Sequence, residues 1–290
     1  MQLRTDLAIE AREIAGDRVS GTAFSEHTEN GLKISRLEVK SRKAKQILGK
    51  DIGTYITIEL PSLTDNFTEA DERIKTIGGE IRRLLPVNGL ILVAGLGNEE
   101  ITPDSLGPKT GSRVLSTRHI TGELARATGL DKLRPVAVIN TGVTGQTGIE
   151  TGEYILSIVN RIRPNAVVAV DALASRRIER LGCTVQISDA GISPGAGVGN
   201  HRTKINQETI GVPVIAIGVP TVVDAQTFAN DVAGGGLSGM GEYSIPGNRQ
   251  MIVIPREIDL LTERASRLLG FSLNAAMQNE FELRDLVSLM

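Results

Sequence analysis

Aromatic residues and cysteine are scarce in this chain of 290 residues. Tryptophan is absent and Phe, Tyr and Trp together make up 3% of the sequence, too few for the base-stacking platforms of proteins that bind single-stranded nucleic acids. Cys183 is the single cysteine, which excludes an intrachain disulfide and a cysteine-based zinc site. The three histidines are too far apart in the sequence for the two-histidine helix of zinc proteases.

A strong charge of either sign and a long apolar run are absent as well. Lys and Arg number 32 and Asp and Glu number 34, and the formal charge of −2 argues against a protein that neutralises many phosphates. No apolar run reaches the ~20 residues of a bilayer span. The first residues also lack the basic and apolar regions of a signal peptide. We therefore expect no direct nucleic-acid partner, no membrane partner and a cytoplasmic location.

The composition that remains is that of a globular protein. Hydrophobic residues make up 40% and charged residues 23%, and a chain of this length can bury a substantial core without disulfides or metals. Glycine, with 32 residues, is frequent. So many glycines suggest tight loops in which the backbone approaches another group closely.

Two different patterns divide the chain. Leu32–Val39 and Thr54–Leu60 alternate apolar and polar residues, which is typical of half-exposed antiparallel strands, and a helix is predicted over Thr68–Leu85. From Gly89 onward short continuous apolar runs appear, as parallel strands covered on both faces require. These runs are Leu90–Ala94, Val136–Ile139, Val167–Val170, Val214–Ile217 and Ile252–Ile254.

The second pattern predicts an α/β fold. Strand-like runs that alternate with helical segments form a doubly wound, mostly parallel sheet with helices on both faces. The first pattern adds an N-terminal antiparallel strand extension, and Thr184–Ser188 is expected to add one more strand. Helices are expected over Ser105–Thr128, Gly148–Ile162, Val222–Val232, Glu257–Leu269 and Ser272–Met290.

Candidate site residues are those that follow the apolar runs, because sites in open parallel sheets lie beyond the carboxyl ends of the strands. Asp171 comes directly after Val167–Val170. A charged residue at this place in a sheet covered on both faces indicates a structural or functional role. Asp104 lies in the loop after the first run. For each aspartate the alternative is that it caps the helix expected after it.

Two carboxylates brought close together can perform acid–base chemistry. At ~4 Å and an effective dielectric constant of ~20 their repulsion is about 4 kcal/mol, or about three pKa units. One carboxyl group then stays protonated as an acid while the other acts as a base on water. The same pair could instead hold a divalent cation. The residue types alone leave both arrangements open.

Common nucleotide and hydrolase motifs are incomplete in this sequence. Gly95–Gly97 begins a dinucleotide fingerprint, but Glu100 stands where the third glycine belongs. A P-loop and a serine nucleophile elbow are both absent. The Gly142–Gly148 loop could hold phosphate with its backbone amides at a helix start. One alternative function is therefore a small-molecule phosphorylase or hydrolase with glycine-rich anion loops, and another is a non-catalytic binding module.

The chain has the residues of a known family over nearly its whole length, most densely in five stretches. They are Arg4–Ala8, Gly95–Lys109, Gly142–Thr151, Val170–Arg180 and Gln186–Asn200, and Val214–Asp224 extends the match. In these stretches the chain resembles the germination (spore) proteases of endospore-forming bacteria, which cleave small acid-soluble spore proteins.

The resemblance implies an α/β core similar to that of hydrogenase maturation proteases. It implies an atypical aspartic-type endopeptidase, made as a tetrameric zymogen in the spore core. The catalytic aspartates proposed for the family match Asp104 and Asp171, and the Asp-Thr/Ser-Gly signature of pepsin-like enzymes is absent. The expected substrates are small acid-soluble spore proteins. We expect no cofactor, with a divalent metal at the two aspartates left open.

The resemblance also implies a processing site. Thr5–Glu10 contains the family's substrate pattern, in which an acidic residue, a large apolar residue, Ala, any residue and Glu follow one another. Cleavage is therefore expected between Asp6 and Leu7. Residues 1–6 would form a pro-segment, shorter than is usual for the family, and residues 7–290 a single α/β catalytic domain with a strand-rich extension over 7–66. The basic residues expected to bind acidic substrate side chains are Lys109, Arg176 and Arg177.

Overall fold

A single sheet joins all the strands of the described residues. The computed structural model describes residues 4–16, 18–63, 68, 71–196, 202–234 and 251–289; residues 1–3 of the expected pro-segment, 64–66 of the expected extension and 197–200 of the last matched stretch lie outside these ranges. The strand order is β1-β2-β3-β7-β8-β6-β4-β5, with β9 paired to β8. The strands are β1 (Thr22–Glu29), β2 (Leu32–Val39), β3 (Gly53–Glu59), β4 (Ile91–Leu96), β5 (Val136–Gly142), β6 (Ala166–Ser175), β7 (Thr184–Ser188), β8 (Val214–Asp224) and β9 (Ile252–Val253).

Four parallel strands form the centre of this sheet. β5, β4, β6 and β8 are neighbours and run in parallel, as their Val- and Ile-rich runs predict. β7 is antiparallel to both β8 and β3, and it joins the centre to the antiparallel strands β1–β3. The predicted α/β fold with an N-terminal antiparallel extension is confirmed. The prediction for Ile252–Ile254 is wrong, because β9 is a two-residue antiparallel partner of the end of β8 and Ile252 is exposed.

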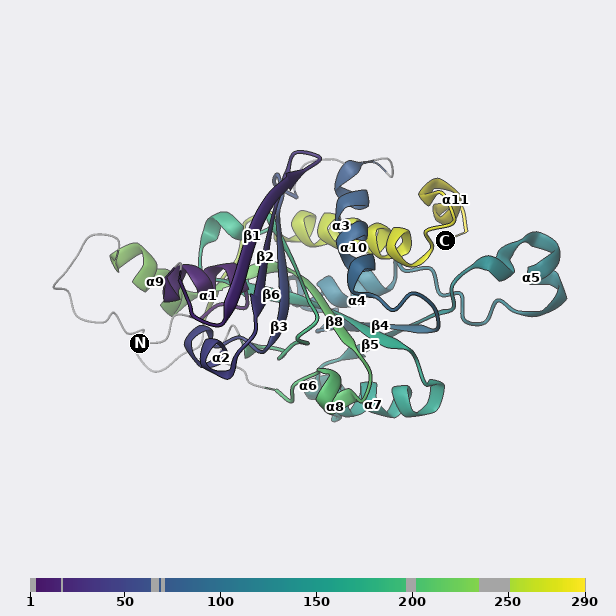
Figure 1. Cartoon of the computed structure of the whole chain (residues 1–290), viewed down its shortest axis with the longest axis horizontal. Coiled ribbons are helices and arrows are strands. Elements are labelled where there is room, and N and C mark those ends of the chain that lie inside the picture. Colours follow the sequence, from purple (N-terminus) through teal and green to yellow (C-terminus); the bar gives the residue numbers. More distant parts are fainter. Residues whose placement is uncertain are drawn as a thin grey trace.

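Helices cover both faces of the sheet (Figure 1). Residues 91 and 93 of β4 contact one hydrophobic cluster, which α3, α4 and α10 complete. Residues 92 and 94 point the other way, into a cluster that contains α7 and α8. The helices are α1 (Ala8–Ala15), α2 (Arg42–Leu48), α3 (Glu72–Leu84), α4 (Leu106–Gly111), α5 (Gly122–Thr128), α6 (Thr144–Thr147), α7 (Thr151–Ile162), α8 (Gln207–Ile210), α9 (Ala225–Gly234), α10 (Ile258–Met277) and α11 (Leu283–Val287).

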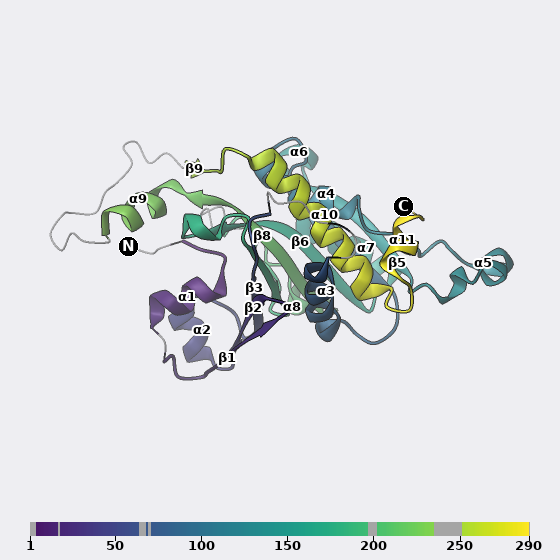
Figure 2. The same ribbon diagram turned by 90° about the horizontal axis from the view of Figure 1, so that it is seen from above.

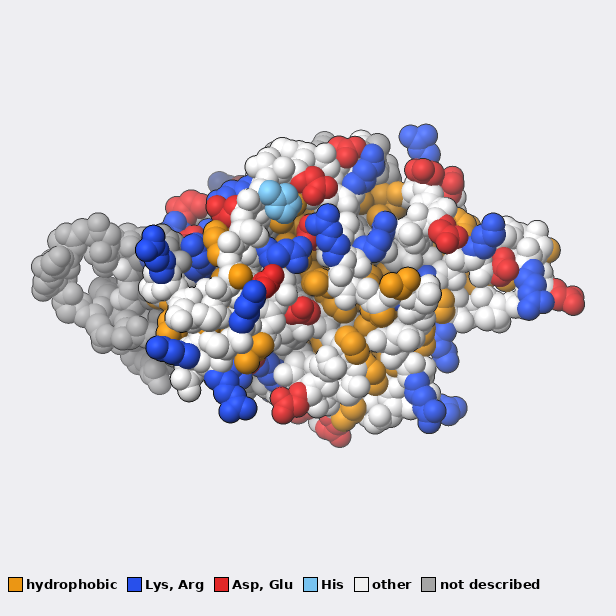
Figure 3. Space-filling model, in the orientation of Figure 1, with side chains coloured by type: hydrophobic (Ala, Val, Ile, Leu, Met, Phe, Trp, Pro, Cys, Tyr) orange, Lys and Arg blue, Asp and Glu red, His pale blue; other side chains and the backbone are white. Residues whose placement is uncertain are grey.

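The helices differ in how they surround the sheet. α3 and α10 pack together on one face, while α1 and α2 lie beside the antiparallel extension (Figure 2). α5 projects at the opposite end of the molecule. Acidic and basic side chains are interspersed on the face shown in Figure 3, as the small net charge leads one to expect. Within the described ranges, every helix is too short or too polar to cross a bilayer.

Several helix boundaries differ from the sequence prediction. The helix expected over Ser105–Thr128 is two helices, α4 and α5, because Thr117 and Arg118 between them donate their backbone N–H groups to Val136 O at the start of β5. The helix expected from Val222 begins at Ala225, since β8 continues to Asp224. α10 runs on to Met277, so the separate helix expected from Ser272 is reduced to the short α11.

Close backbone packing brings α4 against the sheet. A Cβ atom added to Gly107 would lie 2.2 Å from the carbonyl oxygen of Leu96 on β4 and 2.4 Å from that of Val170 on β6. Both neighbours are backbone atoms, which cannot turn away. Gly107 therefore lets the turn that carries Asp104 approach the ends of two parallel strands.

Gly107→Ala is expected to destabilise the protein by about 2 kcal/mol or more, because overpacking against backbone forces the helix away from the sheet. The matched control is Gly79→Ala in α3, where an added Cβ meets no atom within 4 Å. This control should stabilise the protein by about 0.5–1 kcal/mol, since glycine is unfavourable inside a helix. Urea unfolding measures both changes. A Gly107→Ala protein as stable as the parent would contradict this packing.

Candidate active site

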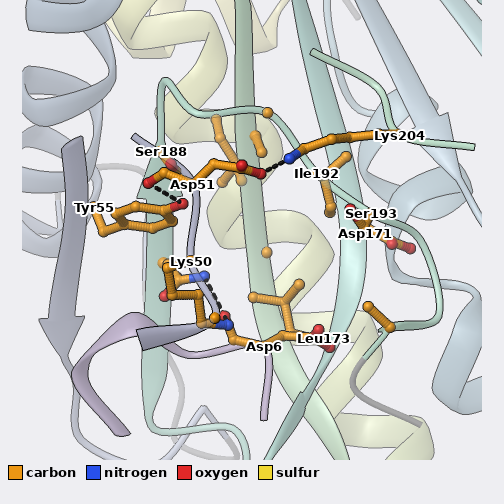
Figure 4. Close-up of a pocket in the computed structure, with 17 residues that line it drawn as sticks. Asp6, Lys50, Asp51, Tyr55, Asp171, Leu173, Ser188, Ile192, Ser193 and Lys204 are labelled. Atoms are coloured by element: carbon orange, nitrogen blue, oxygen red, sulfur yellow. Dashed lines mark hydrogen bonds and ion pairs between the residues drawn. The ribbon is translucent and has the colours of Figure 1, made fainter. Parts of the chain in front are cut away.

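A pocket lies on the sheet face opposite to α3 and α10. Side chains alternate along each strand, so Val185 and Ile187 of β7 point into the core while Gln186 and Ser188 point into the pocket. Asp171 and Leu173 of β6 line the pocket in the same way. In this part of the sheet the N-terminal segment around Asp6, together with the turn after α2, lies over the strands (Figure 4).

Asp171 lies within β6 rather than at its end. Asp171 is 5% exposed, and its backbone pairs with Gly218 of β8. Gly218 makes room for it, because a Cβ there would lie 2.5 Å from Asp171 O and 2.6 Å from the side chain of Leu173. The alternative of a helix N-cap is wrong, since β6 continues to Ser175 and the Asp171 carboxylate accepts the N–H of Ala172 at 3.0 Å.

Asp104 ends a short 3-10 turn, Thr102–Asp104, that contacts β6 and β8. The hydroxyl of Thr221 on β8 donates to Pro103 O at 2.8 Å and fixes the turn. The Asp104 carboxylate accepts the N–H of Asn98 at 2.6 Å, and no side chain caps α4. The N-cap alternative is therefore wrong here too.

The two carboxyl groups interact and differ in environment. Burial raises the pKa of Asp171 well above its usual range, and the charges of Asp104 and Asp6 raise the Asp171 pKa further. Burial also raises the pKa of Asp104, but the hydrogen bond from Asn98 opposes that shift. Asp171 is consequently the carboxyl group more strongly held in the neutral form, and Asp104 the one that ionises more readily.

The N-terminal segment binds along β6 next to Asp171. The N–H of Asp6 donates to Ala174 O at 2.8 Å, and the Asp6 carboxylate accepts the N–H of Ala174 at 2.8 Å. Leu7 is fully buried against Leu173. Because Leu173 is two residues from Asp171 on the same face of β6, the Asp6–Leu7 peptide bond lies in the pocket that contains Asp171.

Glu10 is held by the end of β6 and the residues after it. Its side chain is fully buried, and its carboxylate accepts the backbone N–H groups of Arg176 at 2.7 Å and Arg177 at 3.0 Å. The guanidinium group beside it belongs to Arg180, at 3.5 Å. Arg176 and Arg177 thus contact Glu10 through their backbone N–H groups, and the Arg177 guanidinium group pairs with Glu13 at 3.4 Å.

Lys109 lies on α4, and neither Lys109 nor Asp104 is among the described residues that line the pocket. Asp104 acts on the pocket through its charge, which raises the pKa of Asp171.

Lys50 and Gln186 contact the same segment, and the sequence analysis identified neither. The Lys50 amine donates to Thr5 O at 2.9 Å and to Asp6 O at 2.8 Å (Figure 4). The Gln186 amide donates to Asp6 O at 3.0 Å and accepts the N–H of Ala8 at 2.6 Å. Gln186 begins one of the matched stretches, whereas the sequence around Lys50 has no signal. Burial lowers the pKa of Lys50.

One cluster of potential metal ligands is found among the described residues, and it lies away from the pocket. It consists of His27, Glu29 and Glu80. Glu80 is already paired with Arg36 at 2.7 Å. Within the described ranges, Asp104 and Asp171 do not belong to any such group of three.

Sequence comparison assigns the chain to a known family. A sequence model of the germination proteases matches residues 4–242, which include Asp6, Lys50, Asp104, Asp171 and Gln186. The chain belongs to the germination protease family. It is therefore a protease.

Individual relatives show the same relationship along the chain. A germination protease of Caldanaerobacter subterraneus subsp. tengcongensis is 41% identical over 95% of this chain and 94% of its own length. One from Clostridium perfringens is 40% identical over 98% of both chains. One from Priestia megaterium is 43% identical over 79% of this chain and 65% of its own. A solved NiFe hydrogenase maturation protease from Thermococcus kodakarensis covers 68% of this chain and 98% of its own, with 18% identity and a TM-score of 0.38.

Removing the Asp171 carboxyl group should change stability in a pH-dependent way. A folded-state pKa above the unfolded value means that ionised Asp171 destabilises the fold at high pH, and this penalty vanishes below about 3.9, the pKa of an unfolded aspartate. Asp171→Asn is therefore expected to gain stability at pH 8 and to lose that gain as the pH falls to 4.

Urea unfolding at pH 8, 6 and 4 tests this expectation. The reference protein and the Asp171→Asn variant both carry Asp104→Asn, so that the expected self-cleavage is disabled in each of them. Asp131→Asn, at an exposed position, is the matched control and should show no pH-dependent difference. A stability difference for Asp171→Asn that stays constant from pH 8 to pH 4 would contradict the raised pKa.

Proposed function

We propose that this protease is an atypical aspartic-type endopeptidase that degrades small acid-soluble spore proteins during germination, and that it cleaves its own chain between Asp6 and Leu7. One observation carries the proposal. A segment with the family's substrate pattern is bound along β6, with its expected cleavage site in the pocket of Asp171. The chain's own N-terminus thus occupies the cleft as a substrate would.

The chemistry of the pattern agrees with the contacts of each residue. The acidic first position is Asp6, whose carboxylate accepts a backbone N–H. The large apolar second position is Leu7, buried in an apolar pocket. Ala8 is fully buried, which leaves space for a methyl group only, and Glu10 accepts two backbone N–H groups beside Arg180. A spore protein with the same pattern would find the same four contacts.

The unequal aspartates suit peptide hydrolysis. Asp104, as the carboxylate, removes a proton from water, and the water oxygen attacks the carbonyl carbon of Asp6. Asp171, as the neutral acid, gives its proton to the nitrogen of Leu7 when the C–N bond breaks. A divalent cation held by the two carboxylates is the alternative arrangement for activating water.

The N-terminal segment also suits a zymogen. A substrate from another chain needs the contacts that residues 5–10 occupy, so the bound segment blocks the cleft until it leaves. Arg4 adds to the hold through Asp224 at 3.6 Å and Thr227 at 3.4 Å. We include in the proposal a pro-segment over residues 1–6, a single catalytic domain over 7–290, a homotetramer, a location in the spore core and no cofactor.

The phosphate-binding alternative has less support. The Gly142–Gly148 loop lines a second pocket together with Glu99 and Glu100. Two carboxylates beside the loop would repel a phosphate ion. The loop is therefore a poor anion site, and a phosphorylase is not favoured.

Asp171→Asn and Asp104→Asn should each lower cleavage of a small acid-soluble spore protein by at least ~100-fold, the scale of general acid–base catalysis. The double variant should be little worse than either single variant, because groups that act as one unit are not additive. Mass mapping of the products, with and without a chelator, measures the loss and detects a metal requirement. Asp131→Asn should cleave normally. Fully additive losses would contradict a shared site.

Leu7→Asp should leave the precursor uncleaved, because a charge would enter an apolar pocket. Ile14→Asp in α1, the helix that follows Leu7, is the matched control, and it should be processed normally because Ile14 is 44% exposed. Asp6→Glu should be tolerated. N-terminal sequencing of the mature protein checks all three variants. A mature chain that begins elsewhere than at Leu7 would reject this processing site.

A further inference from the structure

Two side chains converge on the carbonyl oxygen of the peptide bond expected to be cleaved. The Lys50 amine lies 2.8 Å from Asp6 O, and the Gln186 amide nitrogen lies 3.0 Å from the same atom. One donor is the amine of Lys50 and the other a neutral amide. Donors at 2.7–3.1 Å that are aimed at the reacting oxygen are the geometric mark of an oxyanion hole.

We propose that Lys50 and Gln186 form the oxyanion hole of this protease. They bind the carbonyl oxygen of the scissile bond and stabilise the negative charge that develops on it. The assignment rests on the proposed cleavage between Asp6 and Leu7. It adds two catalytic residues to Asp104 and Asp171.

Gln186 is held in position by the sheet and by the segment itself. It lies on β7, whose backbone pairs with strands on both sides, and its side chain points into the pocket. Its amide oxygen accepts the N–H of Ala8 at 2.6 Å. That bond directs the amide nitrogen of Gln186 toward Asp6 O. A single side chain thus spans the scissile bond, with one contact on each side of it.

Lys50 is positioned by the end of α2. Gly49 adopts the left-handed conformation there, with φ 63°, and ends the helix just before Lys50. The amine then donates to the carbonyl oxygens of both Thr5 and Asp6. The carboxylates of Asp6 and Glu10 favour its charged form, which burial opposes. In such a partly desolvated place a cation interacts more strongly with a developing oxyanion than it would in water.

The proposed step is balanced without a further reactant. Water attacks the Asp6 carbonyl carbon and gives a proton to Asp104, while the π electrons of the C=O bond move to the oxygen. Lys50 and Gln186 keep their protons and stabilise this oxygen through hydrogen bonds. The electron pair then returns, the C–N bond breaks, and the nitrogen of Leu7 takes the proton of Asp171. Asp171 is consequently free to serve the leaving group alone.

A simple anchoring role makes a different prediction. If Lys50 and Gln186 only hold the segment, their loss weakens substrate binding and raises KM. If they stabilise the oxyanion, their loss lowers kcat and leaves KM nearly unchanged. The two roles are therefore separated by kinetics and by ligands that mimic different states.

The test compares three single variants of the full chain with the parent protein. Each is assayed on a small acid-soluble spore protein. Lys50→Met removes the cation, and Gln186→Glu keeps the acceptor for Ala8 but replaces the donor to Asp6 O. Each is expected to lower kcat by about 100-fold, the usual effect of removing one oxyanion donor, with KM changed less than about threefold. Lys43→Met, at an exposed position of α2, is the matched control and should keep both constants.

A second measurement separates the transition state from the ground state. The probe is a peptide with the sequence of residues 4–10 in which a phosphinate group replaces the Asp6–Leu7 amide. Lys50→Met should weaken its binding about 100-fold. Binding of the unmodified peptide is measured in Asp171→Asn protein without residues 1–10, so that the chain's own segment does not occupy the cleft. It should change less than threefold when Lys50→Met is added. Equal losses for both ligands would overturn the assignment in favour of anchoring.

Cleavage of the parent protein distinguishes failure of the proposed function from failure of the proposed oxyanion hole. If the parent does not cut between Asp6 and Leu7, the proposed function fails and the oxyanion hole fails with it. If the parent cuts there and both Lys50→Met and Gln186→Glu retain kcat within threefold, only the oxyanion hole is rejected. Circular dichroism and urea midpoints verify that the variants are folded. Should Lys50→Met not fold, the kcat of Gln186→Glu decides.

Discussion

The pairing of Asp6 with Ala174 is the contact on which the arrangement of the cleft depends. β6 continues beyond the four-stranded parallel centre, and its extension offers free backbone groups at Ala174 and an apolar side chain at Leu173 to the N-terminal segment. Once Asp6 is held there, the strand's alternation brings the next peptide bond into the pocket of Asp171. Glu10 then reaches the backbone N–H groups after the strand. In the proposed function, substrate recognition and chemistry therefore share a single strand.

That arrangement requires a carboxyl group inside a covered sheet, which is unfavourable for folding. Gly218 and Gly107 let backbone and carboxyl groups come close together at the ends of the parallel strands. Burial raises the pKa of Asp171 well above its usual range, while the hydrogen bond from Asn98 opposes the rise that burial causes in the pKa of Asp104. In the proposed mechanism, the same burial that costs stability separates an acid from a base. The proposed function also requires residues 5–10 to leave Lys50 and Gln186 before another chain is cleaved.

Sequence patterns predict the parts of this fold whose burial is regular. β2 has the predicted bounds because its alternation has period two, and the Val and Ile runs mark the parallel strands. β1 was missed because it is an exposed, largely polar edge strand. β6 and β8 are longer than their apolar runs, because Asp171 interrupts the run of β6 and Gly218 interrupts that of β8. Asp104 and Asp171 are predicted as site residues because each follows an apolar run of the sequence. Lys50, Gln186 and Arg180 contact segments that are far away in the chain, and no local sequence pattern indicates such contacts.

Hydrogen exchange of three backbone amides tests the bound segment most directly. The N–H groups of Ala174, Arg176 and Arg177 donate to Asp6 and Glu10. In full-length Asp171→Asn protein followed by NMR, the account predicts that all three exchange slowly. In the same protein without residues 1–10 they should exchange at least ~100-fold faster, while Val168 within the sheet is unchanged. Equal rates for the three amides in the two proteins would contradict the binding of the N-terminal segment in the cleft.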